Sequence, residues 1–262
     1  MSKVTRKIIT AGSLVVEAIY PRRDRRDSDK VRAAKTKASS EAQRRMNQIY
    51  SYQLLELLLA TNFPTPGSGL AVVLTFDDEH LPHNRAEAQR RFKYFLRKLR
   101  QARAAANLPE PVVIYAPEVL TSSSGRWHYH LVIDNTGQDM AMLRQCWIYG
   151  SNIEIEKLRV DAEKNHETLA RYMSKELREC QEAYSKPGLH GWSCTRNVKR
   201  PAVETQTAEA DEQIIVPDHC ALLLDDYKET EFARWRVVKY RLPVDLFAAS
   251  PHAPRKRPRA FL

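Results

Sequence analysis

The middle of the chain alternates between short runs of apolar, β-branched residues and longer amphipathic stretches. The short runs are typical of strands because apolar residues fill them at every position or at every second one. We expect strands over residues 70–76, 112–119 and 126–133, near 152–158, and near 190–196. The amphipathic stretches repeat their apolar residues every three or four positions, as helices do. We expect helices over residues 84–106, 139–147 and 165–183.

The order of these elements predicts an α+β fold. An antiparallel β-sheet would carry the helices on one face, a layout similar to the ferredoxin-like and RNA-recognition folds. The open face of the sheet would then be available for a functional site. We expect this domain to span residues 68–201.

Two further segments flank this domain. Residues 1–67 predict a basic N-terminal extension that contains a helix and closes at the Pro- and Gly-containing segment 62–67. Residues 202–262 predict a C-terminal appendage that begins with a polar, acidic stretch, Glu204–Glu212, which we expect to be a loop. A hairpin-like segment over 221–242 follows, and the basic end is expected to be disordered.

Two histidines lie one residue apart in the predicted strand 126–133. Successive side chains of a strand point to opposite faces, so His128 and His130 share one face. Trp127 and Tyr129 then belong to the other face. Two neutral imidazoles on a rigid strand can hold a divalent metal ion. An isolated pair of this kind also occurs on ordinary solvated strands, so its neighbours must decide between the two interpretations.

A carboxylate lies near the end of the preceding predicted strand. Residues 121–125 are polar and end in glycine, which predicts a hairpin loop. Antiparallel pairing then places Glu118 roughly opposite His128 and His130. Two imidazoles and a carboxylate form a ligand set that leaves positions open for substrate. The alternative is a solvated strand carboxylate, and the histidines across the hairpin favour a metal ligand instead.

A tyrosine and a lysine lie three residues apart in the helical stretch that follows. Tyr172 and Lys175 are therefore neighbours on one helix surface. A phenol is a poor nucleophile at its ordinary pKa of about 10, but an ammonium group and a metal-bound phosphate make phenolate attack feasible. The alternative for Tyr172 is a core aromatic residue, which would be preferred without the two histidines.

The composition favours a nucleic-acid partner. The chain has 42 Lys and Arg against 32 Asp and Glu, a formal net charge of +10. The excess is concentrated in residues 22–45 and in the predicted helix 84–106, and a further basic run occupies residues 255–259. Phosphate backbones supply the matching counter-charge, so binding should weaken steeply with salt. The residues expected to contact DNA, or else to be ordinary surface, are Arg126, Arg196, Lys199 and Arg200.

The sequence also limits the compartment. No segment approaches the roughly 20 apolar residues of a membrane span, and the start lacks the cleavage pattern of a signal peptide. The four cysteines are widely spaced without a CxxC pair, which argues against a zinc ribbon and against a disulfide framework. We therefore expect a cytoplasmic protein with reduced thiols and no membrane partner.

The order of these motifs resembles that of the HUH single-strand endonucleases, in which two histidines flank a bulky apolar residue. Glu118, then His128-Tyr129-His130, then Tyr172-x-x-Lys175 carry the resemblance. It is closest to the rolling-circle replication initiators of phages and plasmids, including the gene II type of filamentous phages. It covers roughly residues 70–201, with further matching segments at Leu74–Phe76, the helix from Asn84, Trp147-x-x-Gly150 and Ser193–Pro201.

The resemblance implies a metal-dependent nicking reaction on single-stranded origin DNA. Mg²⁺ or Mn²⁺ held by His128, His130 and Glu118 would polarise the scissile phosphate. Tyr172 would attack it and leave a 5′-phosphotyrosine and a free 3′-hydroxyl, while Lys175 would neutralise charge near the tyrosine. The hydroxyl would prime synthesis by the host replication machinery, a helicase and a polymerase.

Other interpretations remain open. Only one tyrosine lies in this window, because Tyr184 is twelve residues further on. The second strand transfer would therefore need another route, such as a second protomer in a dimer. A single-tyrosine transposase shares these motifs and differs in its substrate. A non-catalytic module that binds single-stranded nucleic acid would fit the basic helices, but it gives no reason for the five site residues to occur together.

Overall fold

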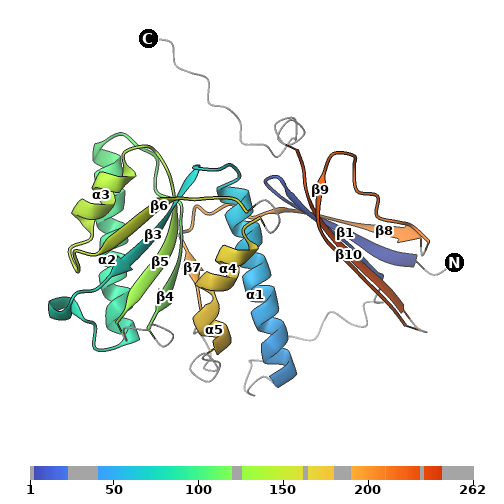
Figure 1. Ribbon diagram of the computed structural model, residues 1–262, viewed down its shortest axis with the longest axis horizontal. Coiled ribbons are helices and arrows are strands. Elements are labelled where there is room, and N and C mark those ends of the chain that lie inside the picture. The colour runs from blue at the N-terminus through green and yellow to red at the C-terminus, as the bar shows by residue number, and fades with distance from the viewer. Residues whose placement is uncertain are drawn as a thin grey trace, which may run out of the picture. The chain divides into compact units, whose positions relative to one another are not determined.

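The chain forms two compact units, one from residues 1–34 and 200–262 and the other from residues 35–199 (Figure 1). The division expected from the sequence has its boundaries elsewhere, at 67/68 and 201/202. The computed structural model describes residues 3–22, 41–119, 126–161, 165–179, 190–209, 211–230 and 233–243. Several expected features lie outside the described residues, namely the 121–125 loop, most of the basic segment 22–45, Tyr184 and the basic end.

Within the described residues, the first unit contains a five-stranded antiparallel sheet built from both ends of the chain. Its strands are β1 (Lys3–Ala11), β2 (Leu14–Pro21), β8 (Ala202–Glu209), β9 (Ala221–Thr230) and β10 (Ala233–Arg241), in the order β8-β1-β2-β10-β9. The expectation of a loop over Glu204–Glu212 is wrong, because most of it belongs to β8 and pairs with β1. Val203, Thr205 and Thr207 are β-branched residues at every second position, which suits a strand.

A buried carboxylate joins the strands of this first sheet. Glu17 of β2 is buried, and it accepts hydrogen bonds from Arg6 of β1 at 2.8 Å and from the Tyr240 hydroxyl of β10 at 2.6 Å. Burial raises the pKa of Tyr240, and the hydrogen bond to Glu17 raises it further, so the phenol stays protonated as a donor. Val15 and Val238 belong to the same small core.

The second unit contains another five-stranded antiparallel sheet within the described residues. Its strands are β3 (Gly69–Thr75), β4 (Val113–Glu118), β5 (His128–Asp134), β6 (Ile153–Lys157) and β7 (Ser193–Cys194), in the order β6-β3-β5-β4-β7. Its helices are α1 (Glu41–Asn62), α2 (Arg85–Ala105), α3 (Asp139–Cys146), α4 (Glu167–Met173) and α5 (Lys175–Glu179), with a 3₁₀ turn over Asp78–His80. No helix among the described residues is long and apolar enough to cross a membrane. The α+β class expected from the sequence is confirmed.

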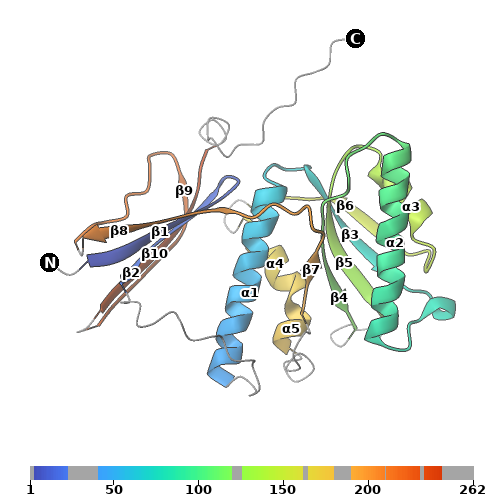
Figure 2. The same ribbon diagram turned by 180° about the vertical axis from the view of Figure 1, so that it is seen from behind.

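Helices cover both faces of this second sheet (Figures 1 and 2). On one face, Phe95 of α2 and Leu131 of β5 belong to a common core. On the other face, Leu58 of α1 and Met173 of α4 share a core with Val132 of β5. The expectation of helices on a single face is therefore wrong. The helix expected in a separate N-terminal extension packs against the sheet and covers its other side.

A buried cluster of charges fixes the end of α2. The Arg103 guanidinium and the Asp139 carboxylate are both fully buried and lie 2.6 Å apart. Arg103 also contacts Asp134, at the end of β5, at 2.9 Å. Asp139 accepts further hydrogen bonds from the backbone N–H and the hydroxyl of Thr136. Each buried charge thus has an opposite charge or a hydrogen-bond donor, which a buried ion pair requires.

We predict that breaking this cluster strongly destabilises the second unit. Asp139→Asn leaves the buried Arg103 charge with one carboxylate fewer, so the free energy of unfolding should fall by about 3–5 kcal/mol. Urea unfolding followed by circular dichroism measures the loss. Arg100→Gln, which removes the partly exposed pair with Glu110, is the control and should cost less than about 1 kcal/mol. Equal losses of the free energy of unfolding in the two variants would contradict the predicted role of the buried cluster.

Candidate active site

The register of β4 and β5 brings together the three side chains expected to hold a metal. Glu118 lies opposite His128, and Ala116 lies opposite His130. Because side chains alternate along a strand, Glu118, His128 and His130 share one face of the sheet. Tyr129 points to the other face, where its ring stacks on Phe92 of α2 with centroids 4.1 Å apart.

The Glu118 carboxylate is shared by two partners. Its Oε1 lies 2.6 Å from Nζ of Lys175, and its Oε2 is hydrogen-bonded to Nε2 of His130. Burial raises the pKa of Glu118, but the hydrogen bonds from Lys175 and His130 outweigh it and leave the pKa below its usual value. Burial lowers the pKa of Lys175, yet the bond to Glu118 raises it above the ordinary value. The buried carboxylate and the ammonium are therefore both charged.

The two histidines are neutral. Burial lowers the pKa of His130 and outweighs the effect of the neighbouring Glu118 carboxylate. Burial also lowers the pKa of His128 below its ordinary value. Since His130 remains neutral while its Nε2 faces a carboxylate, we assign the ring proton to that nitrogen. Nδ1 of His128 lies 3.2 Å from the Thr75 hydroxyl on β3.

Tyr172 lies beside this histidine face. The ring centroids of Tyr172 and His130 are 5.0 Å apart in an edge-to-face arrangement. Nζ of Lys175 lies 4.3 Å from the centroid of the Tyr172 ring. Tyr172 is nevertheless 45 % exposed, so a substrate can reach it. The structure thus places a phenol, an ammonium, two imidazoles and a carboxylate in one region.

The helix expected over residues 165–183 is interrupted at Ser174 within the described residues. The Ser174 hydroxyl donates to the Ala170 carbonyl oxygen at 2.8 Å, a local bond that competes with the helical backbone pattern. Tyr172 therefore lies near the end of α4, and Lys175 is the first residue of α5. Glu176 accepts a hydrogen bond from the Val119 backbone N–H, which ties α5 to the end of β4.

A buried histidine anchors the start of α4. His166 is 1 % exposed, and its Nε2 lies 3.3 Å from the Phe63 carbonyl oxygen just after α1. The ring donates this hydrogen bond, because a carbonyl oxygen can only accept. Arg171 of α4 adds a hydrogen bond of 2.8 Å to the Tyr52 hydroxyl of α1. These contacts hold the tyrosine-bearing helix against α1.

The Trp147-x-x-Gly150 segment fixes the end of β3. Nε1 of Trp147 donates to the Thr75 carbonyl oxygen at 3.2 Å. A Cβ on Gly150 would lie 2.0 Å from that same oxygen, so no residue with a side chain fits there without moving the strand. Thr75 in turn contacts His128. The segment thereby supports one of the two histidines.

The donor types fit a divalent metal ion. His128, His130 and Glu118 share one face, and neutral imidazoles are able to act as ligands. In the part of the chain that the structure describes, however, no three His, Cys, Asp or Glu side chains are gathered closely enough to hold an ion. Glu118 instead contacts His130 and Lys175. An ion held by these residues would replace the contact between His130 and Oε2 of Glu118, while Oε1 would keep its contact with Lys175.

A hollow of about 230 Å³ lies beside Tyr172. Its lining includes His130, Tyr172 and Met173. It also includes Glu154 and Glu156 of β6, which the sequence analysis did not select. The alternation Ile153-Glu154-Ile155-Glu156 was a usable signal, because it assigns both carboxylates to one face of a strand.

One of the residues expected to bind DNA lies near this region. Arg126 lies two residues before the start of β5, at the end of the sheet that carries Glu118 and His128. Its guanidinium lies 2.8 Å from the Asp78 carboxylate. DNA phosphate would have to compete with this exposed pair.

The other three expected DNA contacts lie elsewhere. Arg196 follows β7, whose Cys194 pairs with Ile114 of β4, about 14 Å along the strand from Glu118. Lys199 is exposed near the end of α1, where its backbone N–H donates to the Asn62 side chain at 2.9 Å. Arg200 belongs to the first unit. Within the second unit, the structure therefore does not gather Arg196 and Lys199 around Glu118.

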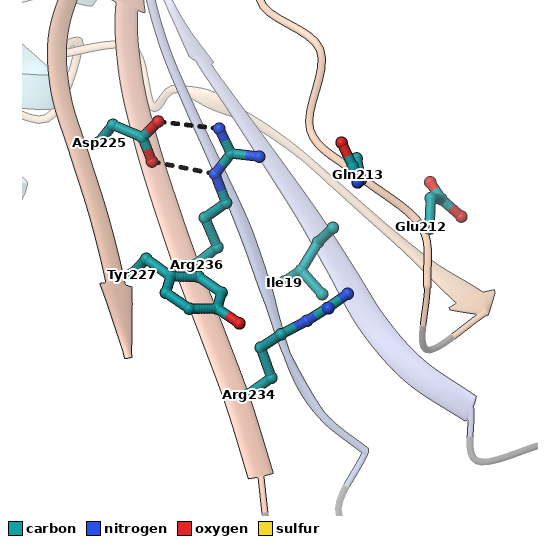
Figure 3. Close-up of a pocket in the computed structure, with 7 residues that line it drawn as sticks. All are labelled: Ile19, Glu212, Gln213, Asp225, Tyr227, Arg234 and Arg236. Atoms are coloured by element: carbon teal, nitrogen blue, oxygen red, sulfur yellow. Dashed lines mark hydrogen bonds and ion pairs between the residues drawn. The ribbon is translucent and has the colours of Figure 1, made fainter. Parts of the chain in front are cut away.

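Another hollow, of about 540 Å³, lies on the sheet of the first unit (Figure 3). Its charged side chains are paired within that unit. Arg236 makes two hydrogen bonds to Asp225, at 2.8 and 2.9 Å, and Glu212 pairs with Arg6 at 2.5 Å. No nucleophile next to an imidazole occurs among its described lining residues. Its described lining therefore differs from the group around Tyr172 on the second sheet.

Comparison with known proteins identifies the region that carries this site. Residues 69–177 match the model of a family of replication-associated proteins, described as the ORF2 and gene II protein type. The match includes Glu118, His128, His130, Tyr172 and Lys175. No curated protein and no solved structure matches the chain. The resemblance to gene II type replication proteins is confirmed over this region.

We predict that acid destabilises the second unit through His166. Burial lowers the pKa of His166 to about 4, against about 6.5 in an unfolded chain. Between these values the unfolded state binds more protons, so stability is complete above pH 6.5 and falls by roughly 3 kcal/mol as the pH drops to about 4. Unfolding in urea at pH 7 and pH 4.5 measures the fall.

His166→Gln keeps a donor for the Phe63 carbonyl but cannot titrate. The difference in the free energy of unfolding between pH 7 and pH 4.5 should therefore be smaller in this variant than in wild type. His83→Gln changes an exposed histidine and should leave the pH dependence of the free energy of unfolding unchanged. An identical pH dependence in wild type and His166→Gln would refute the assignment.

Proposed function

We propose that this chain is a replication initiator that nicks single-stranded origin DNA through a covalent tyrosine intermediate. The match of residues 69–177 to the replication-associated protein family of the ORF2 and gene II type supports the proposal. One observation carries the proposal. The exposed Tyr172 lies against His130 and Lys175, on the face that also presents Glu118 and His128.

The proposed reaction is a transesterification at one phosphate of the DNA. The Tyr172 oxygen attacks phosphorus as the phenol loses its proton, and a bond from oxygen to phosphorus forms. The bond from phosphorus to the 3′-oxygen breaks, and that oxygen takes up a proton to become a 3′-hydroxyl. The 5′-phosphate remains on the tyrosine. No water is consumed, so the bond energy is kept for a later transfer that rejoins the strand.

Lys175 supports the attack by its charge. Its ammonium lies over the Tyr172 ring, so it favours the phenolate that develops during attack. Its contact with Glu118 fixes the position of the ammonium and keeps it protonated. When bound by His128, His130 and Glu118, Mg²⁺ or Mn²⁺ would supply Lewis-acid polarisation of the phosphate oxygens.

The proposal also names partners. The net charge of +10 suits a DNA strand as the substrate. The free 3′-hydroxyl would serve a host polymerase together with a helicase. A single tyrosine can hold one DNA end at a time, so a second protomer in a dimer would supply the tyrosine for the second transfer.

We predict a covalent adduct that depends on Tyr172. Wild-type protein mixed with Mn²⁺ or Mg²⁺ and a diverse labelled library of single strands, including origin DNA, should give a shifted band on a denaturing gel. Peptide mapping should locate the label on Tyr172, and Tyr172→Phe should abolish the band. Tyr50→Phe, a change at an exposed tyrosine of α1, is the matched control and should retain it.

Salt-sensitive DNA binding with no adduct from any strand would refute the nicking activity. It would favour a non-catalytic module that binds single-stranded nucleic acid. Adducts restricted to hairpin ends of a mobile element would instead favour a transposase.

We predict that the charge of Lys175 accelerates adduct formation. Lys175→Met removes the ammonium near the developing phenolate and should slow the rate roughly 100-fold, the scale for loss of one electrostatic contact to a transition state. Lys175→Arg keeps the charge and should recover part of the rate. Single-turnover measurements provide these rates, and circular dichroism checks the fold. Equal rates for the Met and Arg variants would rule out a role for the charge.

A further inference from the structure

We propose that the hollow beside Tyr172 seats one nucleobase next to the nicked phosphate, and that Glu154 and Glu156 select a base with an exocyclic amino group, namely cytosine, adenine or guanine over thymine. The inference rests on the proposed function, since it describes how the same site would choose its DNA.

The position of the hollow supports a base rather than a separate ligand. His130 and Tyr172 line it, so a strand whose phosphate reaches the tyrosine oxygen brings a neighbouring base to this place. Its volume of about 230 Å³ lies below the roughly 300 Å³ or more of pockets that hold drug-sized ligands. Because the hollow is continuous with the proposed active site, the DNA strand that reaches Tyr172 can also fill the hollow, and no separate ligand is required.

The lining offers an apolar surface for a base. Ala71 and Val73 of β3 lie on the same face as His130, because Val73 is paired with His130 in the register. Leu169 and Met173 of α4 complete the apolar part of the lining. A flat base can pack on such side chains and leave water, as bases do in single-strand binding sites.

The polar part of the lining is acidic. Glu154 is paired with Val73 and Glu156 with Ala71, so both carboxylates lie on the face that carries His130. Two strand spacings, about 10 Å between Cα atoms, separate Glu154 from His130. Both residues are exposed, and among the described residues neither carboxylate forms a hydrogen bond or an ion pair.

Carboxylates at this place do not suit a phosphate. In a chain with a net charge of +10, two acids beside the nucleophile repel the DNA backbone. An ionised carboxylate only accepts hydrogen bonds, so it pairs with amino groups such as N4 of cytosine and N6 of adenine. The pairing edge of thymine has no amino group, and its one donor, the ring N3–H, lies between two carbonyl oxygens that repel a carboxylate.

A structural role for the acids gives a different expectation. β6 is an edge strand, and charged side chains protect edge strands from pairing with other chains. If that were their whole role, removing the charges would strengthen DNA binding uniformly and leave the base preference unchanged. The two interpretations therefore differ in base selection rather than in affinity.

The test uses the full-length Tyr172→Phe protein to select binding strands from a random single-stranded DNA library. The selection is repeated with Tyr172→Phe proteins that also carry Glu154→Gln, Glu156→Gln or both. Bound strands are sequenced. One position should favour amino-bearing bases over thymine by at least about fivefold, the lower end of discrimination by a good base contact. The double variant should lose most of this preference, because an amide both donates and accepts. Glu110→Gln, at an exposed acid paired with Arg100, is the charge-matched control and should keep it.

No preference against thymine at any position, or the same preference in the double variant, would overturn the inference. Binding measurements on these variants do not depend on catalysis. An adduct with wild-type protein but no base preference would refute only the inference. A base preference that depends on Glu154 and Glu156, without any adduct from wild type, would refute only the nicking activity.

Discussion

One buried carboxylate organises the candidate site. Glu118 receives an imidazole from β5 and an ammonium from α5, and it lies at the end of β4. A charged group in a buried place is tolerated only where opposite charge or hydrogen bonds compensate it. The same requirement that keeps Glu118 ionised therefore brings Lys175 over the tyrosine ring and holds His130 beside it. The arrangement of the other site residues depends on this one pairing.

The support for this carboxylate comes from segments far apart in the sequence. Ser174 interrupts the helix so that Lys175 begins a new one, while Gly150 allows the segment after α3 to touch the backbone of Thr75. His166 holds the tyrosine-bearing helix from its other end. Each contact is ordinary by itself. Together they place a phenol and two imidazoles from separate elements within one region.

The site was predictable from sequence where local periodicity decides the geometry. Alternation along β5 gives the shared face of His128 and His130, and a hairpin register gives Glu118. The acidic residues of β6 follow the same alternation, but nothing nearby in sequence connects them to the tyrosine. The break at Ser174 was not predictable, because the helical periodicity of the sequence continues through it.

The fold shows the same limit. The strands and helices of residues 70–158 follow from periodicity, and their α+β class was predictable. The strand β8 was not, because its polar sequence becomes a strand only through pairing with β1 at the other end of the chain. Likewise, the amphipathic pattern of α1 predicts a helix but does not specify which surface it covers.

The pairing of both chain ends in one sheet has a consequence for biosynthesis. The β1–β2 hairpin is translated before its neighbours β8 and β10, and its Arg6 pairs with Glu212, 206 positions further along the chain. Two-stranded hairpins are marginally stable alone, and their open edges invite wrong partners. The intervening unit can complete its own sheet during this interval. The hairpin therefore reaches its native pairing only after the intervening unit has been translated, which lengthens the time during which its strand edges are exposed.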